Sequence, residues 1–221
     1  MSAGAEPRYR DGARLVLPIA LAVVAFGVSF GVLARTAGLG RVAPIVLSAT
    51  TFAGSAQFAI VSVLDGGGAV IAAIAAAIML NLRYAPISIA VAPAFEGGLL
   101  RRLLLSQLIV DESFAVSSRG GGRFDLRLLV GAGAVLYPAW VGGTVLGVFG
   151  GGLLGDPARL GLDAAFPALF LALLVPQVRG RRALAAALLG GAIAFATIPF
   201  LPPGLPIVVA AGATLLGWRR S

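Results

Sequence analysis

The sequence predicts an all-α fold: a polytopic transmembrane bundle of seven or eight spans with discontinuous helices. Two observations support this prediction. Hydrophobic residues make up 59% of the 221-residue chain and charged residues 12%, whereas soluble domains average about 45–50% apolar and about 25% charged residues. Apolar runs near the roughly 20 residues that cross a bilayer are separated by short segments rich in arginine, glycine, proline or acidic residues. The expected spans lie near residues 15–34, 43–64, 67–94, 103–118, 128–150, 161–178, 183–200 and 204–218.

We expect a single transmembrane domain, residues 15–218, after a cytoplasmic tail of residues 1–14. The first apolar run, LVLPIALAVVAFGVSFGVLA, follows a basic segment, as the core of a signal peptide would. Its 20 residues exceed the ~7–15 of such a core and match a full span, so it is interpreted as the first transmembrane helix. No extramembrane domain is expected, because the longest polar segment, SSRGGGRFDLR, has the size of a loop.

All 17 basic residues are arginine, and their distribution predicts the orientation. A net charge of +8 could indicate an anionic partner such as nucleic acid. The arginines lie between apolar runs, however, so we expect the chain to contact the lipid bilayer and not a nucleic acid. With a cytoplasmic N-terminus and eight spans, eleven arginines lie inside and five outside, including Arg101 and Arg102. The positive-inside rule then places both termini in the cytoplasm.

The segment 103–118, LLLSQLIVDESFAVSS, is the least typical of the expected spans. It is barely long enough to cross and carries adjacent acids. If it is instead re-entrant, the chain has seven spans and the C-terminus moves to the outside.

Small residues recur at a spacing of four, a pattern that lets membrane helices approach closely. It predicts tight packing within the bundle, with contacts between subunits as the alternative. The segments 26–40 and 141–156 also resemble each other, which suggests two repeated halves, parallel if four elements separate them and inverted if three do. The spaced residues are Gly27 and Gly31; Ala69, Ala73 and Ala77; and Gly143, Gly147 and Gly151.

Three polar groups lie within apolar runs, where an unsatisfied polar group is costly. The first is Gly54, Ser55 and Gln57, preceded by Thr50 and Thr51. A glycine beside hydroxyls can be a packing notch or accompany a serine that bonds its own helix. The alternative is a helix interrupted at Gly54, whose freed amides and positive dipole end would bind an anionic substrate group.

The second group lies in the segment MLNLRYAPISI. Pro86 cannot donate a hydrogen bond to the carbonyl four residues before it, so a kink is predicted there, and Asn81 and Tyr84 share a helical face. Arg83 falls near the middle of its apolar run. An arginine at the bilayer centre costs at least ~2.5–3.5 kcal/mol, so it must meet water, a carboxylate or an anion unless it snorkels.

The third group is Gln107, Asp111 and Glu112. Gln107 and Asp111 are one helical turn apart and face the same way, whereas Glu112 points about 100° away. Adjacent acids at a helix end usually lie at the membrane interface, but a buried one is a plausible proton carrier. Burial would favour the protonated acid and a nearby arginine the charged one, and the sequence leaves this open.

Together the three groups suit a small zwitterionic ligand. Backbone amides or Arg83 would bind its carboxylate, and an acidic side chain or freed carbonyls its ammonium group. The absence of cysteine and histidine excludes disulfides, thiol nucleophiles and the usual zinc or haem sites, and no cofactor is expected. Two other classes of protein remain open. One is an intramembrane enzyme, although two adjacent acids would make a poor metal site, and the other is a non-transporting scaffold subunit.

Four motifs occur in order: FAGSAQF at 52–58, NLRYAPIS at 81–88, VDESFA at 110–115 and GLDAAFPALF at 161–170. They resemble the AzlC-type large subunit of the bacterial branched-chain amino acid exporters, over roughly residues 14–218. The resemblance implies an inner-membrane secondary transporter, not an enzyme, that exports valine, leucine, isoleucine and often methionine with a small AzlD-type membrane subunit. Proton coupling is expected from the acids and from the lack of an ATP-binding G-x-x-x-x-G-K-[ST] motif. Export of another small zwitterion or organic acid is the alternative.

The resemblance also implies which residues act. In similar proteins the residue after the arginine is often histidine, so the tyrosine here removes an imidazole proton carrier. The implied substrate-binding residues are Gly54, Ser55, Gln57, Asn81, Arg83 and Tyr84, and the proton-coupling candidates are Asp111, Glu112 and Asp163.

Overall fold

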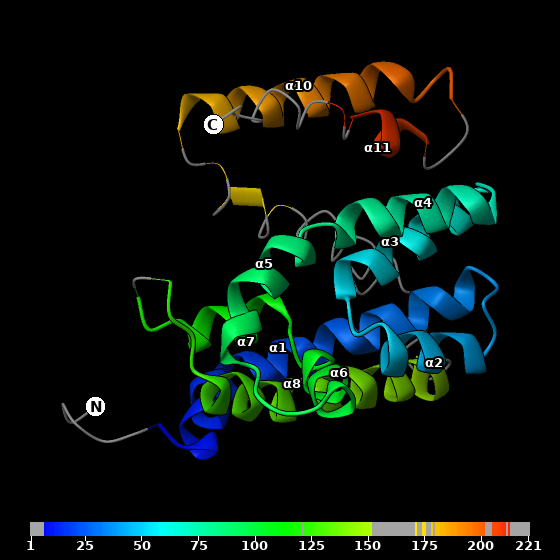
Figure 1. Cartoon of the computed structure of the whole chain (residues 1–221). Helices are drawn as coiled ribbons and strands as arrows, with labels where there is room; N and C mark the ends of the chain where they lie inside the picture. Colours follow the sequence, from blue (N-terminus) through cyan, green and yellow to red (C-terminus); the bar gives the residue numbers. More distant parts are fainter. Residues whose placement is uncertain are drawn as a thin grey trace. The chain divides into compact units, whose positions relative to one another are not determined.

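The computed structural model describes residues 7–120, 122–151, 171, 174–175, 178, 180–201, 205–210 and 212. These residues form helices joined by turns, with one isolated β-bridge between Ser118 and Phe124, so the predicted all-α class is confirmed for them. The chain, drawn in Figure 1, divides into two compact units. Unit 1 comprises Met1–Arg35, Leu39–Gly54 and Arg83–Gly155, and unit 2 comprises Thr36–Gly38, Ser55–Leu82 and Asp156–Ser221.

Three helical stretches in the described part of the chain are long and apolar enough to cross a membrane. They are α1 (Tyr9–Thr36), the stretch Val70–Ala94 and α8 (Leu126–Gly150). The number of spans stays a prediction, and the expected span over 161–178 lies largely outside the described residues. Large apolar side chains such as Leu21 and Phe195, 78% and 81% exposed, suit contact with lipid.

Helix α1 begins earlier than the expected first span. The carboxylate of Asp11 accepts a hydrogen bond from the backbone amide of Arg8 at 2.9 Å, which satisfies one of the free amides at the helix start. Residues 9–14 of the predicted tail are therefore helical. The boundaries of a tail over 1–14 and a single domain over 15–218 stay a prediction.

Helices α1 and α8 pack backbone against backbone through their glycines (Figure 1). A side chain on Gly27 would lie 2.7 Å from the carbonyl oxygen of Trp140, and one on Gly31 would overlap the carbonyl oxygen of Thr144. The four-residue spacing thus serves packing within the chain, as predicted. The glycines in this contact are Gly12, Gly27 and Gly31 of α1 and Gly131, Gly143 and Gly147 of α8.

The two helices run parallel, because contacts along both advance together: Gly12 meets Leu128, and Gly31 meets Thr144. We call the end where both helices begin the Tyr9 end of unit 1 and the opposite end the Arg35 end. Residues 26–35 and 141–150, the parts of the two similar segments that lie on these helices, therefore run in the same direction. The two repeated halves stay a prediction.

Helix α2 (Val42–Thr50) runs antiparallel to α8, from the Arg35 end to the middle of unit 1. Just before α2, the guanidinium of Arg41 lies 5.9 Å from the ring centroid of Phe149, near the end of α8. Further along, the hydroxyls of Ser48 and Thr144 lie 2.7 Å apart and are buried. Helix α2 ends opposite Tyr137, halfway along α8.

Helices α5 (Tyr84–Val91) and η1 (Ala92–Ala94) lead toward the Tyr9 end. There the buried side chains of Val91 and Phe95 pack with Leu129, near the start of α8. The chain then lines a polar cavity together with Tyr9. Residues 95–98 thus connect to the next helix at the end where α1 begins.

Helices α6 (Leu99–Ser106) and α7 (Asp111–Ser117) form what we call hairpin 99–117. It starts at the Tyr9 end, where Arg101 lines the same polar cavity as Tyr9 and Asp125. At its tip, residues 107–110, Leu108 packs against Gly133 of α8.

Helix α7 then returns to the Tyr9 end. The amide of Asp125, the residue that caps α8, donates to the carbonyl of Ser117 at 2.9 Å. The structure thus differs from the single crossing expected over 103–118, and Arg101 lies at the Tyr9 end and not opposite it. A helix of eight residues is about 12 Å long, less than half of the ~30 Å hydrocarbon core.

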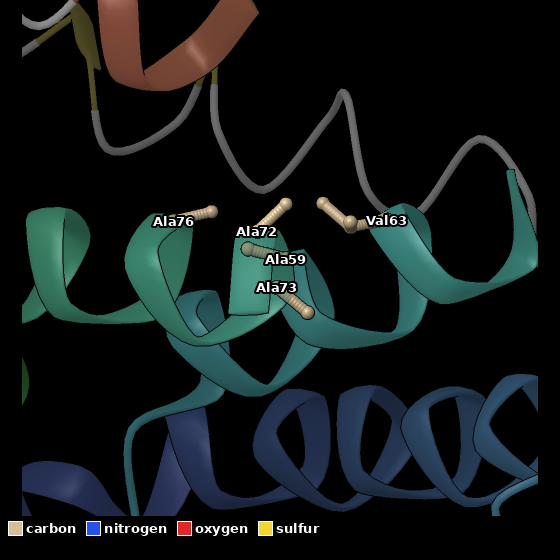
Figure 2. Close-up of a cluster of buried hydrophobic side chains, with 5 residues drawn as sticks. All are labelled: Ala59, Val63, Ala72, Ala73 and Ala76. Carbon is tan, nitrogen blue, oxygen red and sulfur yellow. The ribbon is translucent and has the colours of Figure 1, made fainter. Parts of the chain in front are cut away.

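Unit 2 contains α3 (Gly54–Asp65), of which Gly54 itself belongs to unit 1, and α4 (Val70–Asn81). The two helices pack through a cluster of small buried side chains, shown in Figure 2: Ala59, Val63, Ala72, Ala73 and Ala76. Of the expected stripe at 69, 73 and 77, only Ala73 belongs to this cluster. Ala69 is the exposed N-cap of α4.

The described C-terminal helices also belong to unit 2. Helix α10 (Arg181–Thr197) matches the expected span 183–200, and α11 (Leu205–Ala210) lies at the start of the expected span 204–218. Helix α11 lies beside both α10 and α4.

Candidate functional site

The helix expected over 43–64 is interrupted, as one of the two alternatives predicted. Helix α2 ends at Thr50 and α3 begins at Gly54. The break itself contains Phe52, which has a positive φ of 43°. Gly54 is the first residue of the following helix, so the expectation that the glycine itself interrupts the helix is wrong. The backbone freedom that glycine offers is not used here.

What Gly54 provides is space. A Cβ atom at this position would lie 3.0 Å from the Cη2 atom of Trp140, closer than side chains ordinarily pack. Trp140 is itself only 5% exposed and stacks on Phe30, with ring centroids 6.0 Å apart. The close approach of Gly54 to this ring explains why a glycine stands at the start of α3.

Two side chains bind the carbonyls that the break leaves at the end of α2. The Nε2 group of Gln107 donates to the carbonyl of Thr50 at 2.9 Å and to that of Ala49 at 3.4 Å. The hydroxyl of Tyr137 donates to the carbonyl of Ala49 at 2.8 Å. The last carbonyls of a helix have no partner within it, so these contacts stabilise the interruption. Sequence reasoning placed Gln107 among the polar groups but missed Tyr137, whose partner is a backbone atom that no motif reveals.

A second interruption lies at Leu82 and Arg83. Helix α4 ends at Asn81 and α5 begins at Tyr84. Pro86 is the third residue of α5, where its missing N–H is tolerated, and it cannot donate to the carbonyl of Leu82. The kink predicted from Pro86 is therefore present as a break between two helices.

Arg83 meets a carboxylate, as its position in an apolar run predicted. Its Nη2 atom lies 2.9 Å from the Oδ2 atom of Asp111, and both side chains are about one-third exposed, 29% and 30%. The same nitrogen donates to the hydroxyl of Tyr84 at 3.3 Å, and the guanidinium carbon lies 4.9 Å from the centroid of the Tyr84 ring. Unit 1 thus brings Arg83, Tyr84 and Asp111 together.

Hydrogen bonds at the start of α7 hold the backbone next to Asp111, the carboxylate of this pair, in place. The Ser113 hydroxyl accepts a hydrogen bond from the amide of Val110 at 2.9 Å and donates to the carbonyl of Leu108 at 2.8 Å. Asp111 and Glu112 occupy the first turn of α7, where the helix dipole favours negative charge. Glu112 is half-buried beside the ion pair.

The other expected site residues belong to unit 2 or are not described. Ser55 and Gln57 lie on α3, 2% and 0% exposed, and both interact with other groups of the protein. Asn81 ends α4, and its Oδ1 atom is buried without a hydrogen-bond partner among the described residues. Asp163 lies outside the described residues. Among the residues that the structure describes, no group of three or more acidic side chains could hold a metal ion.

Chemically, the arrangement in unit 1 offers one cation, Arg83, beside two carboxylates, Asp111 and Glu112. A guanidinium binds a carboxylate ligand through charge-assisted hydrogen bonds, and a carboxylate binds an ammonium group in the same way. Since the pair is partly exposed, a small zwitterion could exchange its own charges for those of the pair.

Comparison with known proteins agrees with the motifs. The model of the AzlC protein family matches residues 18–154. An uncharacterized membrane protein of Archaeoglobus fulgidus is 37% identical over 217 residues, 95% of this chain and 94% of the relative. The inner membrane protein YgaZ of Escherichia coli is 27% identical over 208 residues, 88% of this chain and 83% of the relative. The branched-chain amino acid transport protein AzlC of Bacillus subtilis is 25% identical over 221 residues, 95% of this chain and 83% of the relative.

No solved structure matches the chain. The family match spans more than half of the sequence and includes Gly54, Arg83 and Asp111. The Archaeoglobus relative extends the similarity over nearly the whole length. The chain is therefore a membrane protein of the AzlC family, linked to branched-chain amino acid transport.

Proposed function

We propose that this chain is a secondary transporter, not an enzyme, that exports branched-chain amino acids across the bacterial inner membrane together with a small AzlD-type subunit. Family membership supports the class of protein. The name of the Bacillus subtilis relative gives branched-chain amino acid transport for that protein, and the Escherichia coli relative is named as an inner membrane protein.

The observation that carries the proposal is the ion pair of Arg83 and Asp111, which is about one-third exposed and lies where helices begin. Arg83 lies at the start of α5 and Asp111 at the start of α7. Opening the pair leaves the two opposite charges of Arg83 and Asp111 without their partners. A substrate that supplies both a carboxylate and an ammonium group keeps both protein charges compensated, which favours a zwitterion over a singly charged ligand.

Of the remaining site residues, Tyr84 lies with the ion pair in unit 1. Tyr84, bonded to Arg83, orients the guanidinium. Gly54 of unit 1 and Ser55, Gln57 and Asn81 of unit 2 are proposed as substrate-binding residues on the resemblance of their motifs alone.

Proton coupling would act through the acids. The ionised carboxylate of Asp111 would hold the substrate ammonium group while Arg83 holds the substrate carboxylate, and protonation of Asp111 on the outer side would remove the charge that binds the ammonium group and release the substrate. Glu112, beside it, is the second candidate carrier, and Asp163 the third. The protonated carrier would then return and release the proton on the cytoplasmic side, which restores the pair, so that a proton moves inward for each substrate that moves outward, as alternating access allows.

Efflux from intact cells tests the proposal. Bacteria lacking their own exporters are preloaded with labelled valine through a valine-containing dipeptide and express this chain alone or with a neighbouring small membrane subunit. The proposal predicts efflux that needs both chains and is abolished by a protonophore. If valine does not leave while another zwitterion or an organic acid competes for transport, the substrate is wrong. If verified membrane insertion of both chains gives no transport at all, the chain is a scaffold subunit.

A further inference from the structure

Gln107 lies outside the proposed ligand set, yet it makes the closest link between hairpin 99–117 and the helix break. We propose that Gln107 is a positioning residue: it holds the end of α2 against the tip of the hairpin, fixes the break before Gly54, and does not itself touch the substrate. The expected effect of Gln107 on transport rests on the proposed function. Its expected effect on the helix break rests on geometry alone.

The contacts define what Gln107 does. Its Nε2 group carries two N–H donors, and two carbonyls at the end of α2 lie within reach, those of Thr50 at 2.9 Å and Ala49 at 3.4 Å. These carbonyls are freed because α2 stops at Thr50.

The residue type fits the task. A glutamine amide donates two hydrogen bonds, whereas an ionised glutamate of the same size only accepts and would face two carbonyl oxygens. Leucine has a similar volume and offers no donor. Tyr137 binds the Ala49 carbonyl from the side of α8, whereas the Thr50 carbonyl is bonded by Gln107.

The position also links the break to the ion pair. Gln107 and Asp111 stand at the two sides of the tip of hairpin 99–117, and Asp111 binds Arg83. The tip is stiffened by Ser113, which bonds both Leu108 and Val110. Gln107 and the ion pair are therefore held by one short, hydrogen-bonded segment.

The decisive readout is hydrogen–deuterium exchange of the backbone amides in residues 46–54 of the purified full-length protein. The amide of Thr51, which donates to the carbonyl of Leu47 at 2.8 Å, reports the last turn of α2. Gln107→Leu and Gln107→Glu should each speed this exchange by about tenfold, the effect of losing one net hydrogen bond. The matched control Ser106→Ala removes an exposed hydroxyl that bonds only Leu103 within α6 and should leave the exchange unchanged.

Tyr137→Phe keeps the ring and removes only the hydroxyl bond to Ala49, so it provides a second test if a Gln107 variant fails to fold. It should also speed exchange at Thr51, by less than Gln107→Leu because the Thr50 carbonyl stays bonded. In transport, Gln107→Leu should raise the KM for valine and leave the dependence of transport on pH unchanged, since the proton carriers are intact.

Exchange in Gln107→Leu equal to that of the parent would overturn the inference. Faster exchange in the variant, when the parent protein moves no amino acid, would instead support the positioning role and reject the proposed function. Faster exchange with an unchanged KM would show that Gln107 holds the break but that the break does not affect substrate binding. That result would contradict the role of Gln107 as a positioning residue for transport.

Discussion

At the scale of single residues, the account depends on polar groups of unit 1 that each meet a partner. Arg83 pairs with Asp111, and the end of α2 is bonded by Gln107 and Tyr137. Gly54 gives room to Trp140. Each of these contacts joins residues far apart in the sequence, so single substitutions test them separately.

Asp111→Asn keeps the size of the side chain and removes its charge. Because the pair is about one-third exposed, its loss should lower stability by no more than about 1 kcal/mol. Coupled transport should fall much further, since the proposed proton carrier is gone. The measurement is valine efflux against a gradient, with and without a protonophore.

The matched control is Asp65→Asn, which changes an exposed acid at the end of α3. It should transport as the parent does. An Asp111→Asn protein that still exports valine uphill in a protonophore-sensitive way would remove Asp111 from the coupling role.

Gly54→Ala and Gly54→Leu form a graded test of the space beside Trp140. The alanine Cβ would lie 3.0 Å from the ring, so the ring must shift by a few tenths of an ångström and transport should fall only partly. The branched leucine cannot fit without displacing the ring, and transport should be abolished while membrane expression persists. Unimpaired transport by the leucine variant would contradict the role given to Gly54.

The residues show what the sequence could predict. An arginine in an apolar run is costly, so the sequence predicts that Arg83 needs a counter-charge. Whether Asp111 or Glu112 supplies it depends on how the tip of the hairpin is folded. The helix break could be predicted near Gly54 from its polar neighbours. Its place at Phe52 could not, because Gln107 and Tyr137 decide it from distant parts of the chain.

At the scale of elements, the glycine contact of α1 and α8 and hairpin 99–117 organise unit 1. The spacing of Gly27 and Gly31 predicted close packing, and the structure shows α8 as the partner. Hydropathy could not predict the hairpin, because an apolar segment reads the same whether it crosses the membrane or turns back. The two short helices and the acids that start α7 are the local features that decide it.

Gly147→Leu tests the packing of α1 on α8. A side chain at this position would overlap the carbonyl oxygen of Val28, so the helices must separate, at a cost of at least about 1–3 kcal/mol. The thermal midpoint of unfolding in detergent should fall clearly. Gly142→Leu is the matched control, since nothing lies within 4 Å of a Cβ atom there, and a similar fall in both variants would contradict the contact.

Single cysteines in this cysteine-free chain test the path of hairpin 99–117. Gly98→Cys and Ser118→Cys mark its two ends, both exposed, and Val42→Cys, 72% exposed in the parent, marks the Arg35 end. A membrane-impermeant maleimide should label position 42 from one side, and positions 98 and 118 only from the other. Labelling of 98 and 118 from opposite sides would restore a single crossing and contradict the hairpin.

At the scale of the whole molecule, the hairpin changes the distribution of charge. Arg101 joins the arginines at the Tyr9 end, whereas Arg35 and Arg41 lie near the Arg35 end. This strengthens the expectation that the Tyr9 end faces the cytoplasm. The arginines at or beside the Tyr9 end are Arg8, Arg10, Arg14, Arg101, Arg119, Arg123 and Arg127.

The central claim is coupled export of a branched-chain amino acid, and reconstitution tests it most directly. The purified chain and its small membrane partner are placed in lipid vesicles, a pH gradient is imposed, and labelled valine is followed across the membrane. The account predicts that valine accumulates against its own gradient, that the accumulation collapses when the pH gradient is dissipated, and that Asp111→Asn allows no uphill movement. Valine that merely equilibrates, or that moves equally well without a pH gradient, would contradict it.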